Sequence, residues 1–133
     1  EKIDDLVKPN VRFINRQKGS GTRVWLDSML QQMKLSGESI RGYEDERLTH
    51  SDVARGIAEN FADVGVGLES AAMAYGLDFV FLTKERYDLI LFEKTFERPE
   101  VQKLIHWLAS KEGHEFVDRY RGYDASDTGV RQI

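Results

Sequence analysis

The sequence predicts a layered α/β domain with a mostly parallel sheet. Short apolar runs typical of strands alternate with segments whose apolar residues recur at helical spacing. No linker-like tract, internal repeat or low-complexity segment interrupts the 133 residues, so residues 1–133 are expected to form one domain. Right-handed crossovers would gather the strand-to-helix loops at one edge of the sheet, where a binding site is expected.

The first half of the chain contains the alternating pattern that predicts this fold. Leu26, Met29, Leu30 and Met33 are spaced for one buried helix face, and Gly37 is placed to end that helix. The predicted elements, in chain order, are a strand at 11–15, a helix at 22–35, a short strand at 39–44, a helix capped by Thr49 or Ser51, a strand at 62–67 and a helix at 68–75.

The second half begins with two runs rich in aromatic and β-branched residues, LDFVFL at 77–82 and YDLILF at 87–92, and both are predicted to be strands. Pro99 fits the first position of a helix. The remaining segments are a helix from Pro99 through Leu108, an interruption at Gly113, a short helix around Phe116, Val117 and Tyr120, and an irregular tail from Gly122.

Composition excludes several classes of protein. The absence of cysteine excludes disulfide scaffolds, thiolate zinc sites and cysteine catalysis. No apolar run approaches the roughly 20 residues that cross a bilayer, so no membrane contact is expected. A net charge of −4 argues against direct contact with nucleic acid. The charged residues 1–5 lack the apolar core of a signal peptide, and we expect a cytoplasmic protein.

The segment RQKGSGTR, between a predicted strand and a predicted helix, carries the clearest chemical signal. A helix N-terminus offers unpaired N–H groups and a partial positive charge to an anion. Gly21 allows close approach of the backbone, Ser20 and Thr22 add hydroxyl donors, and Arg16 and Arg23 add charge. A localised basic cluster in an acidic chain suits a small anion better than a duplex.

The segment also has an interpretation without a ligand, in which Ser20 or Thr22 merely caps the helix and the arginines are solvated. The segment is not a nucleotide-binding P-loop, because no lysine follows Gly21. It also lacks the third glycine of the dinucleotide-binding fingerprint. We expect no metal site, no cofactor and no enzymatic activity, because no catalytic constellation stands out.

A second strand-to-helix junction, GVGLES at 65–70, has a similar form. Its glycines could bring backbone N–H groups close to a ligand, whereas Glu69 is best explained as a favourable partner of the helix dipole. Tyr87 could donate a hydroxyl to a ligand or fill the core with its polar tip in water. His50 is expected to be a surface histidine rather than a residue that lines the pocket.

Two stretches together resemble a known family. They are VRFINRQKGSGTR at 11–23 and a longer segment that contains THSDVARGIAENFADVGVG at 49–67. They are similar to the type II periplasmic-binding-protein-like domains related to molybdate- and tungstate-binding proteins. Many such domains are fused to molybdate-responsive transcriptional regulators or to molybdenum-cofactor biosynthesis proteins. The resemblance covers residues 3–128.

The resemblance implies a three-layer lobe of a two-lobed fold that clamps an oxyanion such as molybdate or tungstate. It places Ser20, Gly21 and Thr22 against the ligand and Arg16 and Arg23 as charge partners. The resemblance also places the turn of Gly67 and Leu68 beside the cleft. Tyr87 is a looser transfer, because the cleft tyrosine of molybdate binders comes from a comparable but not matched position. The chain would be the second lobe plus the return segment, with the first lobe missing.

The function implied is a sensor that signals anion binding to an attached effector domain. The expected partners are the anion and either a missing lobe or a second copy of the chain, since an exposed apolar face could drive dimerisation. Two alternatives stay open: a domain of a molybdenum-cofactor biosynthesis enzyme, and a regulator effector domain that binds a carboxylate. The anion loop alone does not discriminate between them.

Overall fold

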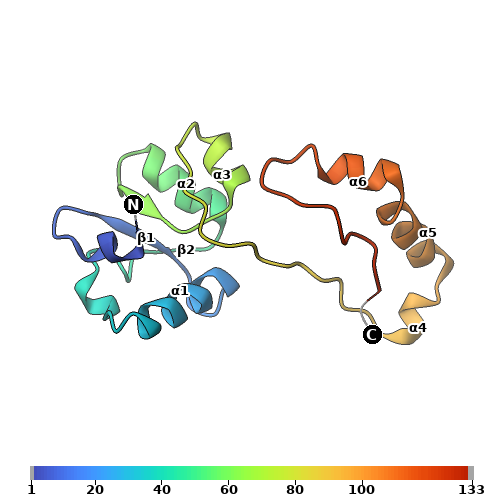
Figure 1. Ribbon diagram of the computed structural model, residues 1–133, viewed down its shortest axis with the longest axis horizontal. Coiled ribbons are helices and arrows are strands. Elements are labelled where there is room, and N and C mark those ends of the chain that lie inside the picture. The colour runs from blue at the N-terminus through green and yellow to red at the C-terminus, as the bar shows by residue number, and fades with distance from the viewer. Residues whose placement is uncertain (1, 132–133) are drawn as a thin grey trace. The chain divides into compact units, whose positions relative to one another are not determined.

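The computed structural model describes residues 2–131 and divides into two compact units (Figure 1). Unit 1 extends to Phe81 and unit 2 begins at Leu82. The sequence contains no linker-like composition at this boundary, which falls inside the first of the two apolar runs that were predicted to be strands.

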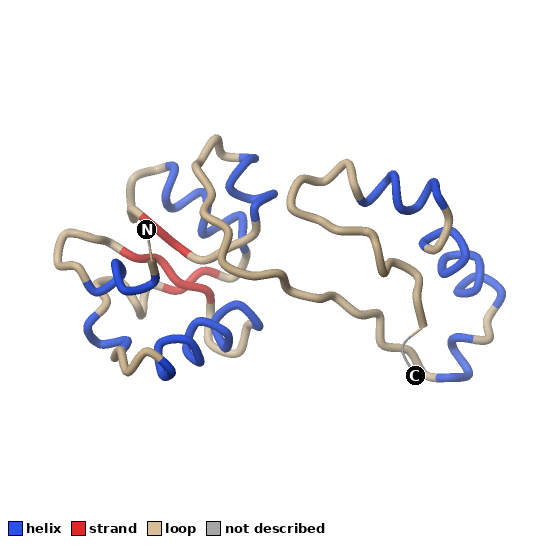
Figure 2. Tube along the Cα trace, in the orientation of Figure 1, coloured by secondary structure: helices blue, strands red, loops and turns tan. Residues whose placement is uncertain are grey.

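Unit 1 is built on a three-stranded parallel sheet in the order β2-β1-β3, shown in red in Figure 2. The strands are β1 (Phe13–Arg16), β2 (Glu46–Arg47) and β3 (Val64–Gly65). Asn15 of β1 is paired with Glu46, and Phe13 is paired with Val64. The predicted α/β class with a parallel sheet is therefore confirmed.

The helices of unit 1 cover both faces of this sheet (Figure 1). They are η1 (Ile3–Val7), α1 (Gly21–Gln32), η2 (Gly37–Ser39), α2 (His50–Ala58) and α3 (Glu69–Ala74). Because successive strand residues point to opposite faces, Phe13 packs with Leu26 of α1, whereas Ile14 packs with Val53 of α2. The result is three layers with a separate hydrophobic cluster on each face.

Helix α1 ends by a different mechanism from the one predicted. The sequence pointed to Gly37 as the stop, but Lys34 adopts the left-handed conformation with φ at 57°. The backbone N–H of Leu35 then donates to Leu30 O at 2.9 Å, and that of Lys34 to Gln31 O at 3.1 Å. Lys34 therefore ends the helix in a Schellman motif, three residues before the glycine that the sequence indicated.

The segment at 39–44 is a turn, and the prediction of a strand there was wrong. Gly42 has φ at 91°, and a Cβ on it would overlap the carbonyl oxygen of Phe13. The amide of Asp45 donates to the carbonyl of Gly42 at 2.9 Å, which closes the turn. Phe13 N donates to the Arg41 carbonyl at 2.8 Å, but the regular strand ladder with β1 begins only at Glu46.

The segments 77–82 and 87–92 form no strand, so these two predictions were also wrong. A strand needs a neighbouring strand for its backbone N–H and C=O groups, and neither segment joins a strand ladder within residues 2–131. Their side chains are exposed, to 65% at Phe81 and to 94% at Ile90. High β-propensity marks both segments, but propensity does not supply the partner.

Unit 2 contains three helices in its described part: α4 (Glu93–Phe96), α5 (Pro99–Leu108) and α6 (Lys111–Val117). Pro99 lies at the start of α5, as predicted. Gly113 does not interrupt the chain but lies inside α6, where it allows close packing on the Trp107 carbonyl. Ser110 caps α6 by accepting from the Gly113 amide at 3.1 Å.

Replacing Gly113 with alanine is expected to lower the free energy of unfolding of unit 2 by about 1–3 kcal/mol, because the new methyl group would overlap backbone atoms. A Cβ there would lie 3.0 Å from Leu108 Cα and closer still to the Trp107 carbonyl oxygen. Urea unfolding followed by Trp107 fluorescence in a Trp25→Phe background measures the effect in this unit. Lys103→Ala, at an exposed position of α5, is the control. Equal unfolding midpoints for the two variants would contradict the packing described here.

Candidate functional site

The carboxyl ends of the three parallel strands meet at one edge of unit 1. The chain leaves β1 toward α1 on one face of the sheet, but it leaves β2 and β3 toward α2 and α3 on the other (Figure 1). Loops that diverge in this way from neighbouring parallel strands open a crevice at the strand ends, and ligands bind in such crevices. The candidate site therefore lies at the end of β1.

Arg16 is the last residue of β1 and supplies the uncompensated charge of this edge. Its Nη2 donates to the Leu48 carbonyl at 3.0 Å, which fixes the side chain across the end of β2. Its Nε is buried and has no hydrogen-bond partner among the described residues. No ion pair joins Arg16 to a carboxylate in that part of the chain. A buried N–H of a charged group without a partner is costly unless a ligand accepts from it.

The GSGT turn follows Arg16 and leads into α1. Gly19 adopts φ at 87°, a conformation that favours glycine, and Ser20 is the N-cap. Ser20 Oγ accepts from the Arg23 amide at 3.2 Å, so the capping interpretation of this serine is correct. Capping uses the oxygen as an acceptor and leaves its O–H as a donor. The amides of Gly21 and Thr22 precede the first intrahelical bond, from Val24 N to Ser20 O at 2.9 Å.

Arg23 is part of the protein interior, with only 3% of its surface exposed. Its Nε donates to Asp27 at 2.8 Å and its Nη1 to Glu46 at 3.0 Å, and the guanidinium lies 4.2 Å above the ring of Tyr43. Burial alone would lower the pKa of Arg23, but its partners Asp27 and Tyr43 raise it above the usual value. These contacts assign Arg23 to the packing of α1 against β2.

His50 is the first residue of α2 and lies beside the second glycine-bearing junction. Its N-cap, Thr49, accepts from the Asp52 amide at 3.0 Å. The ring nitrogen Nδ1 is buried without a hydrogen-bond partner among the described residues, and a Cβ on Gly67 would lie 3.6 Å from it. Burial, and next the charge of Arg16, lower the pKa of His50 to about 4. The prediction of a surface histidine holds in part, because the residue is partly exposed while its Nδ1 is buried.

The structure thus brings most of the predicted site residues to one edge. Arg16 and the GSGT turn lie at the end of β1, and Gly67 and Leu68 lie at the start of α3, where Leu68 is the N-cap. Tyr87 belongs to unit 2 and is 65% exposed. Sequence analysis missed His50 and also Gln17, whose Oε1 is buried without a described partner. Placing β2 at 46–47 would have revealed His50, because the loops after parallel strands share an edge.

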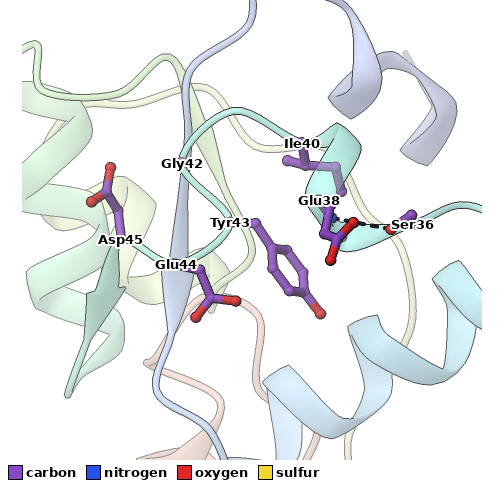
Figure 3. A pocket seen from close by; sticks show the side chains of 8 residues that line it. Ser36, Glu38, Ile40, Gly42, Tyr43, Glu44 and Asp45 are labelled. Atoms are coloured by element: carbon purple, nitrogen blue, oxygen red, sulfur yellow. Dashed lines mark hydrogen bonds between the residues drawn. The ribbon is translucent and has the colours of Figure 1, made fainter.

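A separate hollow of about 460 Å³ lies at the segment between α1 and β2 (Figure 3). Its lining includes Tyr43 and the carboxylates of Glu38, Glu44 and Asp45. An acidic wall repels anions, and Glu44 is already paired with Lys18 at 2.9 Å. Residues 2–131 contain no group of three or more side chains that could hold a metal ion. We therefore do not assign this hollow as the anion site.

Unit 1 has the architecture of a small-ligand-binding domain, with parallel strands that end at helix N-termini and at buried polar atoms without partners. A family model described as PBP superfamily domain matches residues 1–109, and the chain belongs to this family. The match supports a ligand-binding domain and confirms the resemblance to periplasmic-binding-protein-like proteins at this level. None of the helices within residues 2–131 has the length and apolar character needed to cross a bilayer.

Two relatives extend the comparison. A Bacillus subtilis (strain 168) protein described as uncharacterized protein YvgK is 33% identical over 125 residues, which cover 94% of this chain and 40% of that protein. A Clostridium pasteurianum protein described as an uncharacterized protein in the ferredoxin 2Fe-2S gene 5′ region is 30% identical over 107 residues, which cover 80% of this chain and 95% of that protein. This chain thus spans less than half the length of the Bacillus relative. No solved structure matches the chain.

Proposed function

We propose that this chain binds a small tetrahedral oxyanion at the carboxyl edge of the sheet of unit 1. The observation that carries the proposal is Arg16, whose buried Nε has no described partner and which no described carboxylate neutralises. A guanidinium in this state offers charge-assisted hydrogen bonds, which are about twice as strong as neutral ones. Molybdate and tungstate are the candidate ligands that the resemblance adds.

The GSGT turn would hold the other side of the anion. The amides of Gly21 and Thr22 lie at the N-terminus of a 12-residue helix, and Ser20 and Thr22 carry hydroxyl donors. Helix N-termini favour negative charge because their N–H groups lack intrahelical acceptors. In this proposal Arg16 is the charge partner of the anion and Arg23 is not, because the Arg23 guanidinium is paired with Asp27 and Glu46.

The proposed biological role is that of a sensor whose bound anion is signalled to another domain. The Bacillus relative is more than twice as long as the matched segment, so a further lobe or effector domain has room there. The exposed apolar side chains of 79–82 and 89–92 support docking of another lobe or of a second copy, because exposed apolar surface of this kind is typical of interaction sites.

Titration with sulfate, phosphate, molybdate and tungstate tests the binding proposal. We expect saturable binding of at least one anion, with the amide resonances of Gly21 and Thr22 shifting in NMR spectra. A single exposed edge leaves the anion partly hydrated, so a dissociation constant of about 1 mM or below is expected for the isolated chain. Sodium chloride at equal ionic strength is the control for screening. Unchanged spectra with all four anions at tens of millimolar would refute the proposal.

A further inference from the structure

Two buried nitrogen atoms from different strand ends face the same edge of unit 1. Arg16 Nε at the end of β1 and His50 Nδ1 after β2 both lack hydrogen-bond partners among the described residues. Arg16 Nη2 donates to the carbonyl of Leu48, two residues before His50, so the guanidinium lies close to the start of α2. In the proposed function Arg16 binds the anion, whereas His50 has no role.

The imidazole is held in a fixed position. Thr49 caps α2 directly before it, and the backbone at Gly67 lies against Nδ1. An alanine methyl at position 67 would lie 3.6 Å from Nδ1, so the glycine keeps this side of the imidazole free of a further side chain. The ring is confined between the loops that follow β2 and β3, which are the loops that diverge from the one after β1.

Helix α2, which begins at His50, packs against β1, β2, β3 and α3, and all of these except β3 carry charged residues. Arg16 of β1 and Arg47 of β2 are positive, whereas Glu69 of α3 is negative and Glu46 of β2 is paired with Arg23. On α2 itself, Asp52 and Arg55 are paired with each other at 2.8 Å. Burial, and next the charge of Arg16, are what lower the pKa of the imidazole.

A doubly charged anion beside Arg16 would reverse this balance. The imidazole is neutral at pH 7 when the site is empty, because burial and Arg16 both oppose its protonation. An anion that accepts from Arg16 Nε cancels the repulsion and brings an opposite charge to His50. Protonation then makes both ring nitrogens donors, and Nδ1–H gains an anion oxygen as acceptor.

We propose that His50 is a specificity-determining residue of the anion site, which takes one proton from solvent onto its imidazole when a doubly charged oxyanion binds beside Arg16. This inference rests on the proposed oxyanion function and deepens it. The bound site carries two positive charges, from Arg16 and His50, against the two of the anion. The site thereby selects dianions such as sulfate, molybdate and hydrogen phosphate over monoanions such as nitrate and formate.

Calorimetric titration with sulfate at about pH 6, 7 and 8 tests this inference. Sulfate is a useful probe because it stays doubly charged over this range, so any proton taken up goes to the protein. Titrations at each pH in two buffers of different ionisation enthalpy count that proton. We expect uptake of about one proton per sulfate at pH 7, and an affinity that falls up to tenfold for each unit of rising pH.

The variant His50→Asn keeps a polar group near the position of Nδ1 but cannot take up the proton. It should bind sulfate with no proton uptake and with an affinity that does not change with pH, and His50→Gln should behave alike. The control His106→Asn, at an exposed position of α5, should retain the proton uptake of the wild type. Circular dichroism of each variant verifies folding.

The outcomes separate this inference from the function on which it rests. If the wild type binds no tetrahedral anion at any pH, the proposed function fails. If the wild type binds sulfate without proton uptake, or if His50→Asn and His50→Gln retain the uptake, the role of His50 is refuted while the anion site stands. Equal affinities for sulfate and nitrate would also refute it.

Discussion

Replacing Arg16 with glutamine is expected to weaken oxyanion binding by about tenfold to a hundredfold. The change removes the charge and the buried Nε donor, and hydrogen bonds to charged groups contribute about 1.5–3 kcal/mol each. Stability should fall by only about 1 kcal/mol, because the change removes one hydrogen bond, from Nη2 to the Leu48 carbonyl. Titration with sulfate and with molybdate, together with urea unfolding of the same variant, measures both effects.

Arg12→Gln is the matched control for Arg16→Gln. Arg12 directly precedes β1, and replacing it with glutamine removes the same unit of charge. Unlike Arg16, Arg12 pairs with a carboxylate, Asp63, at 2.6 Å, and it also donates to the Asn60 carbonyl at 2.8 Å. This variant should lower stability only slightly, because the ion pair is exposed to solvent, and should leave anion affinity within about twofold of the wild type. Equal losses of affinity in the two variants would show a general charge effect and would contradict a site at the end of β1.

The framework of unit 1 was predictable because its signals are local. The run at 11–15 overlaps β1, and the helical spacing of Leu26 and Leu30 identified the buried face of α1. The glycine-bearing turn between them marked the strand-to-helix loop. Crossover rules then placed the loops at a common edge, and the structure has the carboxyl ends of three parallel strands there.

What the sequence could not show depends on contacts between distant segments. The turn at Gly42 is set by the Phe13 carbonyl, about thirty residues earlier, and the strand-like runs at 77–82 and 87–92 join no sheet within the described chain. The surroundings of His50 Nδ1 include Gly67, which follows β3. A pattern within one segment contains no information on such pairings.

Arg23 shows the same limit for a single side chain. Its position in the GSGTR segment indicated a ligand contact, because a basic residue after a helix start is the usual complement of an anion loop. Its actual partners are Asp27, one helical turn later, and Glu46 and Tyr43, which are about twenty residues away. Short-range spacing identified the charge correctly, but the fold turns it inward.

Arg23→Met is therefore expected to lower the free energy of unfolding by about 2–4 kcal/mol. Removing one partner of a buried ion pair costs about 3–5 kcal/mol, and the cost is smaller here because Asp27 and Glu46 keep 44% and 31% of their side-chain surface in water. Urea unfolding followed by Trp25 fluorescence measures the loss. Arg55→Met, which removes an exposed arginine from α2, should change stability by about 0.5 kcal/mol or less.

The same variant separates the two roles that the sequence allows for Arg23. If its guanidinium acts only in packing, the folded fraction of Arg23→Met at low temperature and without urea binds sulfate within about threefold of the wild type, since Arg16, the amides of Gly21 and Thr22, and the Ser20 cap are all retained. If the folded variant instead loses as much affinity as Arg16→Gln, the result would show that Arg23 contacts the ligand. The pairing of this guanidinium with Asp27 and Glu46 favours the first result, because moving it to the anion would leave both carboxylates without their partner.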